Sequence, residues 1–162
     1  MKTLYMYIGL PGTGKSTYYE KTFGIDTMFN KYTSYISTDK YIEYYAHREG
    51  ITYNEAFDAY IKPSTDFMER DLKAALKDDS IATIVWDQTN LTRKSRARKL
   101  EKIPSDFYKI ACVFPVPANI KERLNGRKGK FISDKLFETM QKSYESPVLE
   151  EGFDQIWRIK NE

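Results

Sequence analysis

The feature that most constrains the fold is a glycine-rich loop between an apolar run and a helical pattern. The run TLYMYIG, residues 3–9, is rich in β-forming side chains and is typical of a strand buried on both faces of a parallel sheet. The loop IGLPGTGKST, residues 8–17, follows at once, and we expect a helix over about residues 15–21. Strand, tight loop and helix in this order predict the first unit of an α/β fold.

The loop satisfies the Walker A pattern, since four residues separate Gly9 from Gly14, which Lys15 and Ser16 follow. Glycines let backbone N–H groups converge on phosphate oxygens, and the helix N-terminus adds the positive end of its dipole. In this pattern the lysine reaches the β- and γ-phosphates of a nucleoside triphosphate, and the serine binds Mg²⁺. The predicted phosphate-binding residues are Gly9, Pro11, Gly12, Thr13, Gly14, Lys15, Ser16 and Thr17.

Strand and helix patterns alternate along the rest of the chain. Further strands are predicted at residues 33–37, 81–86, 107–114 and 153–159. Further helices are predicted at residues 39–48, from 52 onward, 64–77, 92–102, 117–125 and 134–145. We expect Pro63 to break or kink the helix that begins at Thr52. The pattern predicts an α/β fold with a central parallel sheet of about five strands and helices on both faces, in a single domain over residues 1–162. Ligands of such sheets bind beyond the carboxyl ends of the strands.

Composition indicates the cellular compartment of the protein more clearly than the reaction that it catalyses. Lysine and arginine number 26 against 23 acidic residues, a bias too small to indicate nucleic-acid binding by itself. The single cysteine, Cys112, excludes a disulfide framework and fits a reducing compartment. The N-terminus lacks the pattern of a signal peptide, and no run approaches the roughly 20 apolar residues of a membrane span. We therefore expect a cytoplasmic or otherwise intracellular protein with no membrane contact.

The classes of P-loop protein differ in their other motifs. A GTPase needs an Asn-Lys-x-Asp segment, but the Asn-Lys pair at residues 30–31 is followed by Tyr32 and Thr33. A motor or transporter ATPase is usually larger and carries a strong Walker B strand, which Trp86 and Asp87 resemble only in part. The small size and a basic, glycine-punctuated loop at residues 126–132 favour a phosphotransferase that acts on a hydroxyl group.

Such an enzyme needs a base, positive charge and a lid against water. His47 lies two turns along a predicted helix, and we expect it to be exposed. Asp39, which ends the segment ISTD, is either the base or the N-cap of the helix that follows. Arg123 and Arg127 share one helix face and either supply the charge of the site or form a solvated helix end. Gly126 would let this lid segment move.

Several segments together resemble the polynucleotide 5′-hydroxyl kinase family, both the phage-type enzymes and the kinase modules of animal polynucleotide kinase 3′-phosphatases. The P-loop alone is shared with many unrelated proteins, whereas the combination is much more specific and runs over most of the chain. The segments that carry the resemblance are residues 9–17, 36–39, 87–91 (DQTNL), 95–98 (SRAR), 123–127 and the tail from 132 to 153.

The resemblance implies a P-loop kinase fold, ATP as the phosphate donor with Mg²⁺, and a nucleic acid with a 5′-hydroxyl end as the acceptor. It implies that Asp39 is the general base and that Arg127, supported by Arg123, stabilises charge on the transferred phosphoryl group. Asp87 would lie near Mg²⁺, directly or through water, and Asn90 would orient nearby groups. The alternative for Asp87 and Asn90 is a post-strand turn, to which both residue types are suited.

Two departures from the family concern how the acceptor is held. The family often has arginine immediately before the catalytic aspartate, where Thr38 stands, and phage-type members have another three residues after it, where Ile42 stands. The predicted substrate-binding residues are Asp39, Thr38, Asn90 and Arg96. Other basic residues of the predicted helix 92–102 either hold phosphates or form a solvated face: Arg93, Lys94, Arg98 and Lys99. Tyrosines after the base either stack on a substrate base or pack in the core: Tyr41, Tyr44 and Tyr45.

The sequence contains no Asp-x-Asp-x-Thr segment of a companion phosphatase and no ligase lysine motif, which predicts a kinase domain alone. The leading interpretation is a kinase of nucleic-acid 5′-hydroxyl ends, acting in repair or end healing. A kinase of the same architecture that phosphorylates a small molecule, a nucleoside or a tRNA-linked hydroxyl is the second interpretation. The third is a nucleotide-binding module without transfer activity, against which the presence of Asp39 and Arg127 argues.

Overall fold

A computed structural model of the chain describes residues 1–160; residues 161 and 162, which the predicted domain includes, lie outside the described residues. Five strands form one sheet in the order β2-β3-β1-β4-β5, and every neighbouring pair is parallel. The strands are β1 (Thr3–Ile8), β2 (Thr33–Ile36), β3 (Thr83–Asp87), β4 (Tyr108–Val113) and β5 (Gln155–Arg158). The predicted parallel sheet of about five strands is confirmed.

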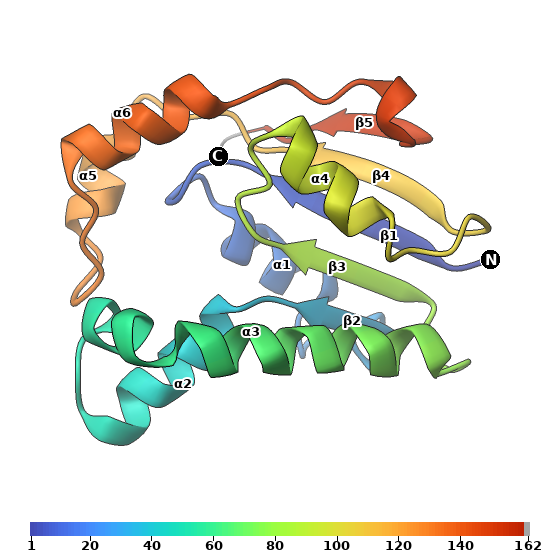
Figure 1. Cartoon of the computed structure of the whole chain (residues 1–162), viewed down its shortest axis with the longest axis horizontal. Coiled ribbons are helices and arrows are strands. Elements are labelled where there is room, and N and C mark those ends of the chain that lie inside the picture. The colour runs from blue at the N-terminus through green and yellow to red at the C-terminus, as the bar shows by residue number, and fades with distance from the viewer. Residues whose placement is uncertain (161–162) are drawn as a thin grey trace.

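In residues 1–160, six α-helices and two short 3-10 helices connect the strands (Figure 1). They are α1 (Lys15–Phe23), η1 (Asn30–Tyr32), α2 (Asp39–Glu49), α3 (Tyr53–Lys77), α4 (Arg93–Leu100), α5 (Ile120–Asn125), α6 (Asp134–Ser143) and η2 (Leu149–Glu151). The helix predicted from Pro117 begins instead at Ile120, because Pro117 opens a turn whose carbonyl accepts the N–H of Ile120 at 3.2 Å.

The alternation of side chains along the strands creates two hydrophobic cores, one on each face of the sheet. On one face Leu4 and Met6 of β1 pack with Met68 and Leu72 of α3. On the other face Tyr7 of β1 packs with aromatic residues of α1. The prediction of helices on both faces is therefore confirmed.

The prediction that Pro63 breaks a helix is wrong, because α3 is continuous from Tyr53 to Lys77. A proline in a helix interior removes one backbone hydrogen bond and costs about 3 kcal/mol. Buried residues lie on both sides of it, including Ala56 before and Met68 after, so packing holds both halves in line. The start of α3 has the predicted capping box, formed by Thr52 and Glu55.

The carboxyl ends of the central strands come together at one edge of the sheet, where Tyr7 of β1 lies opposite Asp87 of β3. Figure 1 shows that the α5–α6 connection reaches from this edge toward the beginning of α3. A hydrogen bond of 3.3 Å from the Asn54 N–H to the Gly129 carbonyl joins the two. In residues 1–160 we find no helix long and apolar enough to cross a membrane.

Candidate functional site

The glycine-rich loop connects β1 to α1 at this edge. Gly12 and Gly14 have φ angles of +80° and +93°, which residues with a Cβ rarely adopt. A Cβ on Gly12 would also lie 2.8 Å from Leu124 Cδ2, and one on Gly9 would lie 2.9 Å from Phe114 Cβ. The loop therefore needs glycine both for its turn and for the close approach of α5 and of Phe114, which directly follows β4.

Lys15 lies at the start of α1 with its ammonium group turned back into the loop. Its Nζ donates to the carbonyl of Gly9 at 2.7 Å and to that of Leu10 at 3.1 Å. Burial lowers the pKa of Lys15 to about 8, while Asp87 and Asp39 act in the opposite direction. An enclosed cation held by neutral carbonyls gains when phosphate oxygens replace them, so the loop fits a nucleotide phosphate chain.

The other loop residues divide into structural and exposed groups. The buried Thr13 hydroxyl donates to the Leu10 carbonyl at 2.7 Å and so fixes the turn. Pro11 is half-buried, whereas Ser16 and Thr17 of the first helical turn are exposed. These exposed hydroxyls fit a ligand lying over the N-terminus of α1.

Asp87 and Ser16 are the residues that would hold Mg²⁺. Burial raises the pKa of the Asp87 carboxyl, and Lys15 counteracts the rise. The Tyr35 hydroxyl donates to Asp87 and also contacts the Ser16 hydroxyl, so the two predicted metal residues share a neighbour. In the described part of the chain we find no group of three His, Cys, Asp or Glu side chains able to hold a metal ion. Mg²⁺ that bridges nucleotide phosphates needs only one or two protein ligands, so the pair fits that ion.

Asn90 was predicted to contact substrate, and the structure corrects this. Its side chain is buried, with 1% of its surface exposed, and Nδ2 donates to the Tyr7 carbonyl at 2.7 Å. Its Oδ1 accepts from the ammonium group of Lys99. Asn90 has a φ of +50°, which asparagine tolerates better than most residues. The residue therefore ties the end of β1 to α4, and it positions the phosphate loop from behind.

Arg96 was also predicted to contact substrate, and it too lies in the interior. Its side chain is 0% exposed, and Nε and Nη2 bond the Glu151 carboxylate at 2.8 and 3.1 Å. Its Nη1 donates to the carbonyls of Asn90 and Leu91. The guanidinium is fully engaged with the protein and is out of reach of a substrate phosphate.

Asp39 is the first residue of α2, directly beyond β2, and its side chain is 52% exposed. The N-cap position belongs to Thr38, so the carboxylate of Asp39 is available for other contacts. Its Oδ1 accepts a hydrogen bond from the Tyr53 hydroxyl, and its Oδ2 lies 3.3 Å from Lys130 Nζ. These two partners come from the start of α3 and from the lid loop after α5.

The two lid arginines do not share one helix face as predicted, because α5 ends at Asn125 and Arg127 lies in the loop after it. A Cβ on Gly14 would lie 3.8 Å from Arg123 Nη1, which places that guanidinium over the phosphate loop. Burial lowers the pKa of Arg127, while Asp39 and Tyr53 act in the opposite direction. Among the described residues, the buried Nε and Nη2 of Arg127 have no hydrogen-bond partner. Buried donors of this kind usually find a partner, and a bound anion would supply it.

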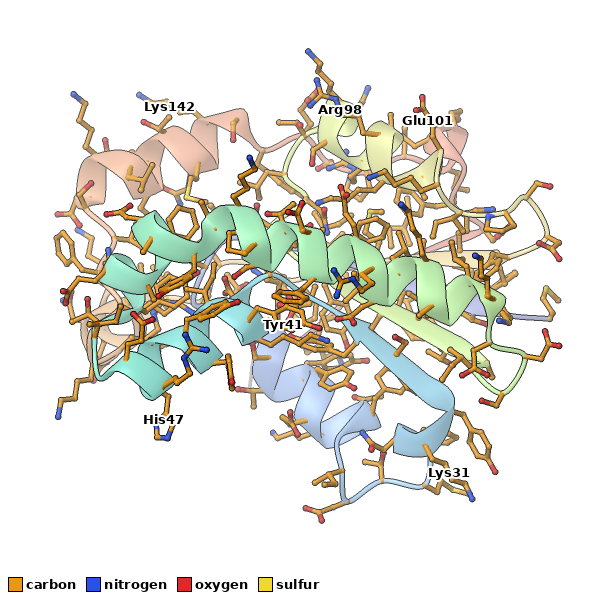
Figure 2. All side chains as sticks on the ribbon, turned by 60° about the horizontal axis from the view of Figure 1, so that its bottom comes forward. Lys31, Tyr41, His47, Arg98, Glu101 and Lys142 are labelled. Carbon is orange, nitrogen blue, oxygen red and sulfur yellow. The ribbon has the colours of Figure 1, made fainter. Side chains whose placement is uncertain are left out.

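Two predicted candidates around α2, and Ile42, which stands where phage-type kinases have arginine, have structural positions. The Thr38 side chain is buried, and its hydroxyl accepts from Gln88 Nε2 at 3.4 Å. Tyr41 lies between α2 and α3, stacked on Phe67 (Figure 2). Ile42 is 0% exposed. This face of α2 is therefore occupied by packing.

The remaining candidates of α2 and α4 divide between packed and exposed positions. Tyr45 stacks on Tyr60, whereas Tyr44 is 57% exposed. His47 points away from the body of the molecule in Figure 2 and is exposed, as predicted. The basic residues of α4 that are exposed are Arg93, Lys94 and Arg98.

Sequence reasoning missed three residues that line the site: Tyr35, Tyr53 and Lys130. Tyr35 was predicted only as part of a strand, and alternation along a strand does not show which side chain a hydroxyl will meet. Tyr53 directly follows the recognised cap at Thr52, and Lys130 belongs to the recognised basic loop. The signal was present for both segments, but their contact with Asp39 depends on tertiary structure.

The parallel sheet has the order β2-β3-β1-β4-β5, and the phosphate loop follows its central strand. Together with a carboxylate beyond the second strand and a lid that bears arginines, these features define a P-loop protein with a kinase-type fold. The chain belongs to the AAA domain family, whose model matches residues 4–147. The chain has no significant match among curated protein sequences.

Solved structures show the same fold. A protein from Chloroflexus aurantiacus j-10-fl, provisionally assigned as a kinase, aligns with a TM-score of 0.64 and 15% identity over 98% of this chain and 84% of its own. A fungal RNA kinase aligns with a TM-score of 0.55 and 16% identity over 98% and 74% of the two chains. A gluconokinase from Sinorhizobium meliloti 1021 aligns with a TM-score of 0.53 and 18% identity over 97% and 81%.

Proposed function

We propose that this protein is an ATP- and Mg²⁺-dependent phosphotransferase that moves the γ-phosphate to the 5′-hydroxyl of a DNA or RNA end. The observation that carries the proposal is the position of Asp39. Its half-exposed carboxylate stands beyond β2, within electrostatic range of both Lys15 and Arg127. The electrostatic interaction of this carboxylate with the P-loop lysine and with a lid arginine supports in-line phosphoryl transfer, which needs a base and positive charge beside the phosphates.

The residues have separate roles in the proposed reaction. The P-loop N–H groups, Lys15 and Arg123 bind the phosphates. Ser16 and Asp87 would hold Mg²⁺, which would supply further positive charge to the phosphates. Asp39 takes the proton of the acceptor hydroxyl, whose oxygen bonds to the γ-phosphorus as the bond from that phosphorus to the ADP oxygen breaks. The electron pair of that bond stays on ADP. Arg127, whose buried nitrogens need a partner, pairs with the transferred phosphoryl group.

Support for a polynucleotide acceptor comes from the motif combination around Asp39 and residues 87–91, and from the likeness to a fungal RNA kinase. The likeness to a gluconokinase favours a second candidate, a kinase of a small-molecule hydroxyl. A non-catalytic module has less support, since it would not need both Asp39 and Arg127 at the phosphate loop.

Transfer from γ-labelled ATP to a panel of acceptors tests the proposal. The panel is 5′-hydroxyl DNA, 5′-hydroxyl RNA, nucleosides, tRNA and gluconate. We expect label on an oligonucleotide end, and label on gluconate or a nucleoside alone would favour the second candidate. The absence of labelled product with every acceptor would contradict a transfer function.

The variant Asp39→Asn tests the role of the base. We expect it to retain ATP affinity and to lose about 10²–10⁴-fold in turnover. Asp58→Asn is a matched control, because it removes an exposed carboxylate of α3. Normal turnover in Asp39→Asn would remove Asp39 as the base.

A further inference from the structure

Lys130 has surroundings that are unusual for a lysine in a lid loop. Its Nζ lies 3.3 Å from Asp39 Oδ2 and 3.3 Å from Glu43 Oε1, and its side chain is only 19% exposed. The same ammonium group lies 4.2 Å from the centre of the Tyr53 ring. Two carboxylates and an aromatic face thus hold one cation directly on the proposed base.

The backbone of the lid loop is fixed at this place by the start of α3. Asn54 Nδ2 donates to the Phe131 carbonyl at 2.9 Å, and the Phe131 N–H donates to Asn54 Oδ1 at 2.7 Å. Gly129, with a φ of +72°, accepts from the Asn54 N–H on the other side of Lys130. The loop therefore presents Lys130 at a defined position, from which its four-carbon side chain can reach other partners by changing rotamer.

The contacts of Asp39 raise a chemical difficulty for the proposed reaction. Tyr53 donates to Oδ1 and Lys130 contacts Oδ2, so an acceptor hydroxyl meets a carboxylate on which each oxygen already has a partner from the protein. The Tyr53 hydroxyl can stay in place during the reaction, because it orients the Asp39 carboxylate, so Lys130 is the partner that we expect to move. A cation that leaves two acids needs another anion, since an uncompensated charge in a partly enclosed site is costly.

The space beside Lys130 is suited to such an anion. An open pocket of about 390 Å³ lies between the lid loop and the start of α3, and its lining includes Lys130, Arg127 and Phe131. Helix α5 and the lid loop that follows it (residues 126–132) together span residues 120–132 and carry five basic residues and one acidic residue. On the α2 side, Ile42 is fully buried, and the Lys40 ammonium group pairs with Asp71 at 3.1 Å. Neither residue therefore offers the anion a free cation, which leaves this role to the lid loop.

We propose that Lys130 is the acceptor-anchoring cation: it binds a phosphate group adjacent to the acceptor hydroxyl, and in doing so it frees Asp39 Oδ2 for that hydroxyl. This rests on the proposed phosphotransferase function and restricts it to acceptors that carry a neighbouring phosphate, such as the end of a nucleic-acid strand. With an uncharged acceptor Lys130 stays on Asp39, and transfer is slow.

A pair of matched acceptors tests the assignment. The wild-type protein, Lys130→Gln, Lys130→Arg and Lys128→Gln are assayed with a nucleoside and with the same nucleoside carrying a 3′-phosphate. A charge-assisted hydrogen bond is worth about 1.5–3 kcal/mol, so we expect Lys130→Gln to lower kcat/KM for the phosphate-bearing acceptor about 10- to 150-fold. Transfer to the nucleoside should be as fast as in the wild-type protein or faster, because the variant no longer holds a cation on Asp39 Oδ2. Lys130→Arg should restore part of the preference. Lys128→Gln removes an exposed charge from the same loop and should change neither acceptor by more than about twofold.

Binding provides a readout that does not depend on turnover. Fluorescence anisotropy of a labelled 5′-hydroxyl trinucleotide, measured without ATP, should show weaker binding by Lys130→Gln than by Lys128→Gln. An equal loss for both acceptors in Lys130→Gln, or equal trinucleotide binding by the two variants, would overturn the assignment.

The outcomes separate the two proposals. Wild-type transfer that is equally efficient with and without the 3′-phosphate leaves the phosphotransferase proposal intact and rejects the role of Lys130. If the wild-type protein transfers phosphate to no acceptor, the phosphotransferase proposal fails, and the anisotropy comparison still decides whether Lys130 binds the phosphate.

Discussion

Replacement of Arg96 by methionine separates a structural role of this arginine from a substrate-binding role. The change removes a guanidinium that is 0% exposed and leaves Glu151, whose side chain is 11% exposed, without its cation. It also leaves the carbonyls of Asn90 and Leu91 without the Nη1 donor. Methionine fills much of the same volume, so the effect should come mainly from the lost polar contacts.

The size of the effect follows from this burial. Removing one partner of a buried ion pair costs about 3–5 kcal/mol, because the other charge stays in a poorly solvated place. For a chain of this length each kcal/mol lowers Tm by about 2–4 °C, so Arg96→Met should lower Tm by about 6–20 °C. An exposed arginine of the same helix, Arg98, lies on the outer surface in Figure 2, and Arg98→Met should change stability by no more than about 0.5 kcal/mol.

The assay combines urea unfolding with acceptor kinetics measured well below the Tm of the variant. We expect Arg96→Met to lose stability while its KM for the acceptor stays within about twofold of the wild-type value, since the side chain does not reach the cleft. Wild-type stability together with a raised acceptor KM would refute the structural role and restore the interpretation that the sequence suggested.

Two further predictions concern the phosphate loop. Burial lowers the pKa of Lys15 to about 8, so nucleotide affinity measured by fluorescence titration should fall as the pH rises through that value, and Lys15→Arg should flatten the profile. Nucleotide affinity that does not change with pH in the wild-type protein would contradict the assignment. The same shift affects stability, because the unfolded chain keeps this proton up to the ordinary pKa of 10.5. Lys15 therefore lowers the free energy of unfolding below about pH 8, and this loss is progressively recovered as the pH rises from there to 10.5. Gly12→Ala combines a φ of +80° with a 2.8 Å contact to Leu124 and should weaken nucleotide binding about tenfold or more. Gly50 has a similar φ of +66° but lies away from the phosphate loop, so Gly50→Ala is the control. It should lose stability and keep its nucleotide affinity. Equal nucleotide affinity in the two variants would count against the close approach of α5.

Most of the fold could be predicted because its signals are local. A buried strand is an uninterrupted apolar run, and the cap at Thr52 and the glycine after α2 mark helix ends within a few residues. Pro63 was misjudged for the same reason, since a local rule takes no account of the packing that holds both halves of α3 in place. The start of α5 was placed three residues early, because Pro117 is also a good first residue of a turn.

The two sides of the candidate site differed in how far the sequence could predict them. The phosphate side lies in one short segment, so its residue types and spacing are visible together at Gly9 to Thr17. The acceptor side is assembled from α2, the start of α3 and the lid loop, and Asp39 and Lys130 are 91 positions apart. The sequence around a lysine or arginine does not show whether its side chain faces solvent, a carboxylate or a phosphate.

The sequence by itself determined the α/β fold and the phosphate loop, because each depends on the conformational preferences of neighbouring residues. It also indicated Asp39 as the candidate base, through the resemblance to a kinase family. Only the tertiary structure decided which charged side chains are buried in the interior and which face the candidate site. Arg96 is buried because Glu151, 55 residues later, meets it with both carboxylate oxygens. Lys130 lies on Asp39 because Asn54 fixes the lid loop against α3. Burial of a charge requires a partner, and the chain brings the partner close only when it folds.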